Sequence, residues 1–315
     1  MNKPLVTVII PAYNHERFVE ASIRSVIQQD YCNIELVIIN DGSRDRTHEI
    51  ICTLEDECKQ RFSRFEYINK KNEGLAQTLN QGVLWSQADY ITAIASDDLM
   101  KPCKTSSLLQ ALLTAAPEVG LSYADAEFID DEGQQIGLDN DSKSCDLATG
   151  WTSFIGFYTR HRPEVKIGEN SFDYKVLLRG NFLPAMSVMW RRSILQKVGM
   201  FTQGIVIEDW DLWLRMARNC QSVYVPQVVA SYRWHASNSV KTLIPQIRKG
   251  QDDILMRELK YFVNNPVLSK LIAKLVIINA LKLIVARQFK VALVRLLDMG
   301  LWRCALFGAK NDRAS

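Results

Sequence analysis

The 315-residue chain lacks the features that define several protein classes. Its seven cysteines are odd in number and scattered, without a C-x-x-C pair, which argues against a disulfide framework or a zinc site and for reduced thiols in the cytoplasm. No stretch approaches about eighteen uncharged apolar residues, so no transmembrane span is expected. The apolar run Leu5–Ile10 is too short for a signal-peptide core and predicts a strand instead.

The composition is that of a globular protein, with 47% hydrophobic and 23% charged residues. The charge is unevenly distributed along the chain. Residues 1–239 contain 24 basic and 30 acidic side chains, a net charge of −6, whereas residues 240–315 contain 14 basic and 5 acidic ones, a net charge of +9. A mildly acidic body with a basic tail indicates an anionic partner, such as a membrane or a nucleic acid.

Strand and helix signals alternate in the first third of the chain. Buried, β-branched runs predict strands over Leu5–Ile10, Ile34–Ile39, Phe65–Ile68 and Tyr90–Ala95. Between them, apolar spacing predicts helices over Phe18–Gln28, Asp45–Glu57 and Leu75–Trp85. This alternation predicts a doubly wound, mostly parallel α/β sheet with ligands at the carboxyl ends of its strands. From Asp130 to Asn170, scattered glycines, acids and amides predict long loops over the site.

Polar clusters follow the first three predicted strands. Asp41 stands directly on a strand tip, earlier than a helix cap needs, where its carboxylate can accept the ring N–H of a base. Tyr13, after the first strand, offers that base a stacking face. Ser43 and Asp45 have a simpler alternative role as caps of the next helix. Asn72-Glu73-Gly74 precedes a helix N-terminus, where glycine permits close backbone approach and anions are favoured.

Two acidic clusters are candidates for chemistry. The adjacent carboxylates of Ser96-Asp97-Asp98 repel each other, so either a divalent cation compensates them or they form a solvated loop. In Glu208-Asp209-Trp210-Asp211, the neighbouring indole rings can raise a carboxyl pKa toward that of a general base, the alternative being a plain amphipathic helix start. Tyr232-Arg233-Trp234-His235 adds an imidazole in an aromatic setting.

Taken in this order, the clusters resemble the inverting family 2 glycosyltransferases with the GT-A fold. The resemblance covers Leu5 to Ser239 and rests on the combination of motifs. Two positions depart from the family pattern. Asn40 replaces the usual first Asp of the DDGS motif, and Leu79 replaces an Arg that often contacts phosphate. The resemblance implies a GT-A catalytic domain over residues 1–239, with a donor half (about 1–100) and an acceptor half (101–239), followed by a helical extension over residues 240–315.

The resemblance also implies a UDP-sugar donor and Mn²⁺ or Mg²⁺, with no nucleic-acid partner. It assigns the uracil to Pro11, Ala12, Tyr13 and Asp41. It assigns the diphosphate and sugar to Asn72, Gly74, Ser96 and Asp97. It makes Asp98 and His235 metal ligands, Asp209 the catalytic base, and Glu208 the residue that orients the acceptor.

The implied reaction is a single displacement. The base removes a proton from an acceptor hydroxyl, whose oxygen attacks the anomeric carbon opposite the departing UDP, so an α-linked donor gives a β-glycoside. The implied acceptor is a saccharide on undecaprenyl diphosphate, in the synthesis of O-antigen or a related polysaccharide. A nucleotidyltransferase is an alternative, but its Gly-rich basic loop is missing after the first strand. A membrane-docked, non-catalytic nucleotide-sugar-binding module is a second alternative, against which the intact carboxylates argue.

The basic tail predicts amphipathic helices between Pro266 and Lys310. At 100° per residue, Lys270, Lys274 and Lys282 share one face, and a restart at Gln288 places Lys290, Arg295 and Asp298 on one side. Two helices with a break near Arg287 fit this pattern. They either pack on the catalytic domain or anchor it to an anionic membrane surface, which would place the protein on the inner face of the cytoplasmic membrane.

Overall fold

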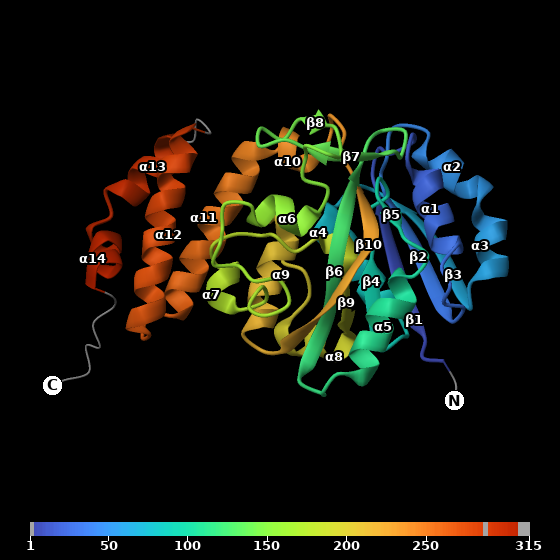
Figure 1. Cartoon of the computed structure of the whole chain (residues 1–315), viewed down its shortest axis with the longest axis horizontal. Coiled ribbons are helices and arrows are strands. Elements are labelled where there is room, and N and C mark those ends of the chain that lie inside the picture. Colours follow the sequence, from blue (N-terminus) through green and yellow to red (C-terminus); the bar gives the residue numbers. More distant parts are fainter. Residues whose placement is uncertain (1–2, 286–288, 308–315) are drawn as a thin grey trace.

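A central mixed sheet carries the functional loops of the molecule (Figure 1). The computed structural model describes residues 3–285 and 289–307. The sheet runs β3-β2-β1-β4-β9-β6-β10-β5, and the short strands β7 and β8 extend it from β6. The strands are β1 (Val6–Ala12), β2 (Ile34–Asp41), β3 (Arg64–Lys70), β4 (Tyr90–Ala93), β5 (Leu99–Met100), β6 (Val119–Ile129), β7 (Gln135–Leu138), β8 (Ser144–Cys145), β9 (Val188–Arg191) and β10 (Gln221–Arg233).

The predicted α/β class with a mostly parallel sheet is confirmed. Strands β3, β2, β1 and β4 are parallel neighbours, as are β6 and β10, whereas β9 and β5 pair antiparallel. The helices of this first half are α1 (Val19–Ile27), α2 (Thr47–Thr53), α3 (Glu55–Arg61) and α4 (Leu75–Trp85). The prediction of one helix over Asp45–Glu57 is wrong. Leu54 is buried at the junction of α2 and α3, and the acidic run after it begins a new helix.

The two longest strands, β6 and β10, were not predicted. Small and polar residues break the apolar pattern of β6, and its Asp125 is buried because the Ile155 backbone N–H (3.0 Å) and the Ser153 hydroxyl donate to it. Pro226 lies within β10, where the register with β6 shifts between Val225 and Val228. Both strands therefore depend on partners far away in the sequence rather than on a local pattern.

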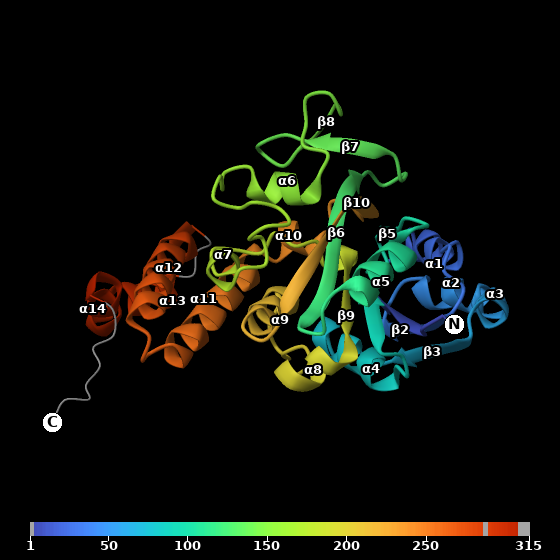
Figure 2. The ribbon, with the colours of Figure 1, turned by 60° about the horizontal axis from the view of Figure 1, so that its bottom comes forward.

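Short elements replace the long loops expected between residues 130 and 170. Figure 2 shows β7, β8 and α6 above the carboxyl end of β6. Aromatic rings from this region and from β10 pack together, with Phe154 against Tyr232 and Phe128 against Trp234. The remaining elements of the body are α5 (Lys104–Thr114), α6 (Phe154–Thr159), α7 (Tyr174–Leu177), η1 (Ala185–Ser187), α8 (Arg192–Val198) and α9 (Glu208–Ala217).

Helices gather at one end of the molecule after β10 (Figures 1 and 2). They are α10 (Ser239–Thr242), α11 (Ile244–Tyr261), α12 (Pro266–Val285), α13 (Phe289–Leu296) and α14 (Met299–Phe307). The predicted break near Arg287 falls on a residue outside the described ranges, and α12 ends at Val285 before it. A second division, between α13 and α14, was not predicted.

Buried ion pairs fix α11 to the catalytic body. Arg257 of α11 pairs with Asp211 of α9, and Arg218 pairs with Glu258, which also accepts a hydrogen bond from Tyr174 (2.6 Å). Ile272 and Val276 of α12 share one apolar core with residues of α9. Arg295, expected on an exposed basic face, instead donates to the buried Asp252 of α11 (3.1 Å). The inner sides of these helices therefore serve packing.

The outer side of α12–α14 is apolar and exposed. Val267, Ile278, Leu281 and Val285 lie on one stripe of α12, and the side chain of Val285 is 85% exposed. Similar side chains follow on the next two helices: Phe289, Leu293, Val294, Trp302 and Leu306. Within the described ranges, no helix has the length and apolar character needed to cross a membrane. The end of α12 at Val285 lies at the same side of the molecule as the carboxyl ends of the central strands (top of Figure 1).

Candidate active site

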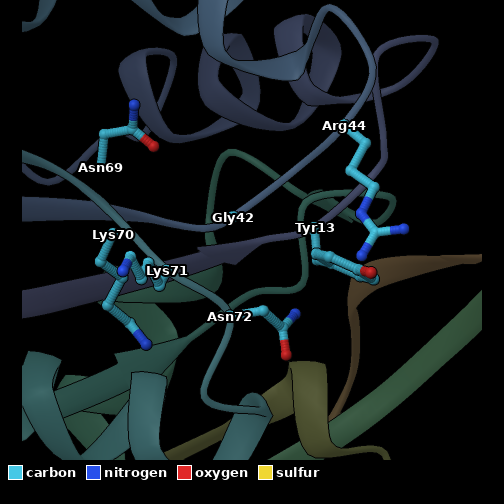
Figure 3. Close-up of a pocket in the computed structure, with 7 residues that line it drawn as sticks. All are labelled: Tyr13, Gly42, Arg44, Asn69, Lys70, Lys71 and Asn72. Carbon is cyan, nitrogen blue, oxygen red and sulfur yellow. The ribbon is translucent and has the colours of Figure 1, made fainter.

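A polar pocket of about 590 Å³ opens where β1, β2 and β3 end (Figure 3). The aromatic ring of Tyr13, 43% exposed, and the guanidinium of Arg44 lie on one side of it. The rest of the lining comes from Gly42, Asn69, Lys70, Lys71 and Asn72. An exposed ring beside three cations suits a nucleotide, because the ring can stack on a base while the cations face phosphates.

Asp41 is buried behind this pocket and holds its loops together. Its carboxylate accepts the Lys70 ammonium (2.5 Å) and the backbone N–H groups of Glu73 and Gly74 (both 2.9 Å). Burial opposes ionisation of Asp41, but the Lys70 and backbone hydrogen bonds outweigh it and lower its pKa below the ordinary value. Asp41 is therefore ionised at neutral pH, as an acceptor for a base N–H must be.

The loops after β1 and β2 bind each other through side chains. Asn14, with φ of +53°, accepts from the Arg44 backbone N–H (2.8 Å), and its own N–H donates to the Ser43 hydroxyl (2.9 Å). Asp45 accepts from the N–H of Thr47 (3.0 Å), the first residue of α2, but the cap position itself belongs to Arg46, so Asp45 supports the helix start from one residue further away. Asn40, which departs from the family pattern, accepts from the Ser43 N–H (3.3 Å). Its side-chain amide therefore helps to hold the loop after β2.

Other predicted donor-site residues lie around the same edge. Pro11 and Ala12 end β1 beside β2, and Asn72 lines the pocket while its amide donates to the Asp41 carbonyl (2.9 Å). Gly74, with φ of +90°, caps α4. Leu79, in place of a phosphate-binding Arg, is buried in the core, so cations at this edge come from the pocket lining instead.

Asp97 lies between two imidazoles. His235 Nε2 is 3.0 Å and His15 Nε2 is 3.5 Å from the same carboxylate oxygen of Asp97. One ligand atom from each of these three residues falls within 4.8 Å of the others, close enough to share a metal ion. Ser96 is buried and its hydroxyl contacts His15 Nδ1 (2.8 Å), which orients the ring. Burial opposes ionisation of Asp97, but the His235 hydrogen bond and the His15 imidazole lower its pKa.

The structure places Asp98 differently from the expectation. His235 does meet a carboxylate, but this is Asp97, whereas Asp98 turns away and accepts the Arg233 backbone N–H (2.9 Å). Burial and the charge of Asp97 raise the pKa of Asp98 well above its ordinary value. Nearby, burial lowers the pKa of the Lys104 ammonium to about 7. The carboxylate that lies between His235 and His15 is therefore that of Asp97, and the role of Asp98 as a metal ligand stays a prediction.

Arg233 binds the ends of several segments together at this site. Its guanidinium donates to the Asp97 carbonyl (2.9 Å) and to the carbonyls of Asp130 (2.7 Å) and Asp131 (2.9 Å). These partners lie 102 to 136 residues away in the sequence. The metal-type cluster therefore depends on the pairing of β10 with β5, the strand that directly follows Asp97 and Asp98.

The acidic residues at the start of α9 lie in two different environments. Asp211 is fully buried and accepts from Thr202 (2.6 Å) and Arg215 (3.0 Å); these contacts and Arg257 outweigh burial and lower its pKa. Burial instead raises the pKa of Asp209, although Asn181 donates to it (2.6 Å). Burial and the charge of Asp209 raise the pKa of Glu208 well above its ordinary value.

Tyr232 connects the two acidic clusters. Burial raises its pKa, and the charges of Asp97, Asp98 and Asp209 all add to that shift. The acids that follow β4 and Asp209 of α9 are therefore both near enough for their charges to act on Tyr232. Sequence reasoning missed His15, Asn181 and Lys104 as site residues. Only His15 carried a signal, since it directly follows the first polar motif.

Comparison with known proteins identifies the family and supports the fold. The model of Glycosyl transferase family 2 matches residues 7–181, and the chain belongs to that family. An uncharacterized glycosyltransferase of Rickettsia prowazekii is 24% identical over 79% of this chain and 70% of its own length.

Two solved structures share the GT-A fold. S. aureus TarS in complex with UDP-GlcNAc superposes with a TM-score of 0.58 at 13% identity, covering 85% of this chain and 70% of that one. Mannosyltransferase PcManGT from Pyrobaculum calidifontis, in complex with GDP-Man and Mn²⁺, gives 0.58 at 14% identity over 98% of this chain and 85% of the other.

Proposed function

We propose that this glycosyltransferase moves a hexose from a UDP-sugar to a saccharide hydroxyl with inversion, in a metal-dependent reaction. The observation that carries the proposal is the presence of two acidic clusters, one in which Asp97 lies between His15 and His235 and one at the start of α9 where Asn181 holds Asp209. One cluster has the ligand types of a cation site, and the other has carboxyls with raised pKa values. General-base catalysis needs a carboxyl of this second kind.

The donor is a UDP-sugar in this proposal. Tyr13 stacks on the uracil, Asp41 accepts its ring N–H, and Asn72 with Gly74 lies toward the diphosphate. Lys71 and Arg44 supply the positive charge that Leu79 does not, since Lys70 is already paired with Asp41 and Glu73. The UDP-GlcNAc complex of TarS supports the choice of uridine, since the two chains share a fold.

The metal ligands are His15, Asp97 and His235. Two imidazoles with one carboxylate are donors that Mn²⁺ accepts more readily than Mg²⁺, which prefers oxygen ligands. The Mn²⁺ in the PcManGT complex supports this choice. A divalent cation held there neutralises negative charge that develops on the departing diphosphate. Ser96 and Arg233 keep His15 and the Asp97 backbone in place for it.

Asp209 is the catalytic base. Its ionised carboxylate takes the proton of the acceptor hydroxyl as the oxygen forms its bond to the anomeric carbon, and the bond from that carbon to UDP breaks on the opposite face. Asn181 holds one Asp209 oxygen and fixes its direction. Glu208, whose raised pKa favours the protonated form, donates a hydrogen bond that orients the acceptor. An α-linked donor then gives a β-glycoside.

The acceptor is a saccharide on a polyprenyl diphosphate, as in O-antigen or related polysaccharide synthesis, and the enzyme works as a peripheral protein on the inner face of the cytoplasmic membrane. The exposed apolar side chains of α12–α14 and the basic residues among them suit an anionic lipid interface. In Figure 1 these helices lie at the opposite end of the molecule from β1–β3, but α12 ends on the same upper side as the carboxyl ends of the central strands.

The deciding experiment is a UDP-release assay with a panel of UDP-sugars, with Mn²⁺, with Mg²⁺ and with EDTA. We expect one donor to be preferred, Mn²⁺ to support the higher rate, and EDTA to abolish release. Product analysis by NMR should show a β-linkage. Full release in EDTA would contradict the metal site, and an α-linked product would contradict the single displacement.

A further inference from the structure

Four cations come from the segments near Asp209 and from the C-terminal helices. Arg162 follows α6, Arg179 follows α7, Arg248 lies on α11 and Lys282 lies on α12. Helices α7, α11 and α12 are neighbours in both views (Figures 1 and 2). None of these side chains belongs to the donor pocket or to the metal-type cluster.

Arg162 lies next to the residue that holds the proposed base. Its guanidinium packs on the backbone of Gly180, where an added Cβ would come 2.5 Å from Nη2. Gly180 directly precedes Asn181, the hydrogen-bond partner of Asp209. A side chain at position 180 would displace the guanidinium. Glycine at this position therefore lets Arg162 lie beside the residue that precedes Asn181.

Arg248 and Lys282 lie on the helical side of the same region. Two residues after Arg248, Gly250 packs on Ile207, the neighbour of Glu208, at 3.4 Å from an added Cβ. Asn279 of α12 donates to the Arg248 carbonyl (3.2 Å), and Lys282 follows one turn later. Burial lowers the pKa of Lys282, and the charges of Arg248 and Arg162 lower it further. These three cations therefore repel one another.

Carboxylates do not balance this group within residues 3–285 and 289–307. No ion pair joins a carboxylate to any of the four cations, and only Glu164 acts on Arg162 from a distance. The buried Nη1 of Arg162 has no hydrogen-bond partner. Elsewhere the chain pairs its buried charges closely, as at Arg257 with Asp211. Arg162 and Arg248 are half-buried, and Arg248 donates only to the neutral Gln251 amide (2.9 Å), whereas Arg179 and Lys282 are exposed. Half-buried cations without a carboxylate partner are unfavourable unless an anion joins them.

We propose that Arg162, Arg179, Arg248 and Lys282 bind the diphosphate of the lipid-linked acceptor. This rests on the proposed function, from which it takes the lipid-linked saccharide. Guanidinium groups bind phosphate oxygens in pairs, and a diphosphate offers enough charge for several cations. The acceptor then runs from its sugar hydroxyl at Asp209, through its phosphates at the cations, to its lipid chain on Leu281, Ile284 and Val285.

The test is calorimetric titration of the full-length protein with farnesyl diphosphate, in the presence of saturating UDP and Mn²⁺ to occupy the donor site. R248Q and K282Q should each weaken binding about tenfold, the effect of one lost charge-assisted contact. The control K260Q changes an exposed α11 lysine far from the group and should bind as the wild type does. UDP affinity should be equal in all four proteins.

Two further titrants separate the sources of phosphate. Farnesol should bind far more weakly than farnesyl diphosphate, and inorganic diphosphate should bind more weakly but with the same loss in R248Q and K282Q. Equal farnesyl diphosphate affinity in wild type, R248Q and K282Q would overturn the proposal. Inorganic diphosphate binding as tightly as the farnesyl compound would overturn the lipid-linked ligand. Failure of the proposed function would appear instead in the UDP-release assay, which uses the donor site.

Discussion

The donor side and the acceptor side of this protein differ in how completely their polar groups are satisfied. On the donor side, Asp41 has three hydrogen-bond donors, and Asn14 and Asn40 bind neighbouring loops. On the acceptor side, Arg160, Arg162 and Asn181 each keep a buried polar atom without a partner, among the residues described. The donor pocket is thus preorganised, whereas the acceptor region has groups that a substrate can satisfy.

The largest difference between the acceptor side and the donor side is expected when the proposed base, Asp209, is replaced. D209N keeps the shape and the Asn181 contact but cannot take a proton, so kcat should fall by about 10²–10⁴ while UDP affinity stays constant. Rapid-mix kinetics and calorimetry measure the two quantities. Loss of UDP binding in D209N would make Asp209 a donor-side residue and remove the distinction.

Substitution of the two adjacent acids should separate them. D97N removes the carboxylate between His15 and His235 and should reduce Mn²⁺ binding and activity on the order of 10²-fold. D98N should cost less than about tenfold, because the raised pKa of Asp98 favours a neutral group and Asn still accepts the Arg233 N–H. Electron paramagnetic resonance of Mn²⁺ checks binding. The reverse order of effects would restore Asp98 as the ligand.

The pH dependence of kcat should be set by Asp209 on the acceptor side, whereas UDP binding on the donor side should not depend on pH in the same range. Because burial raises the pKa of Asp209, kcat should fall about tenfold per pH unit below that pKa, as the base becomes protonated. UDP affinity should not change over the same range, since the lowered pKa of Asp41 keeps it ionised. N181A removes a contact that lowers the Asp209 pKa and should move the fall in kcat to higher pH. Parallel falls in kcat and UDP affinity would contradict this assignment.

The smallest effect is expected from the donor ring. Y13A removes the stacking face and should weaken UDP binding by about tenfold, with Y13F as a control that keeps the ring. The kcat at saturating donor should not change. A change in kcat without a change in UDP affinity would show that Tyr13 does more than stack on the uracil.

Elements that are specified by residues close in sequence could be predicted, whereas elements that depend on distant residues could not. The strands β1 to β4 and helix α4 carry local patterns, and their expected bounds agree with the structure to within about two residues. Strand β6 includes a buried Asp125 and β10 includes Pro226, so no alternating or continuous apolar pattern marked them. The same limit applied to the site. Nothing local to Asp97 or Asp98 indicated which carboxylate would face His235, 138 residues away.

The helical end could be predicted in kind but not in detail. The basic tail indicated helices, and Lys282 is exposed as an amphipathic face requires. Arg295, however, pairs with Asp252 because both residues become accessible to each other only after α11 and α13 pack. A helical wheel describes one helix and cannot include such a partner.

The span of Arg233 has a consequence for the order of events during synthesis. The residues of the nucleotide pocket lie within positions 13–72 and leave the ribosome early, whereas His235 and Arg233 emerge more than 130 residues after Asp97. A nascent chain can therefore form its base-binding loops well before it can hold a cation. The proposed metal site can form only after β10 has joined the sheet, so metal binding there would report that this region has finished folding.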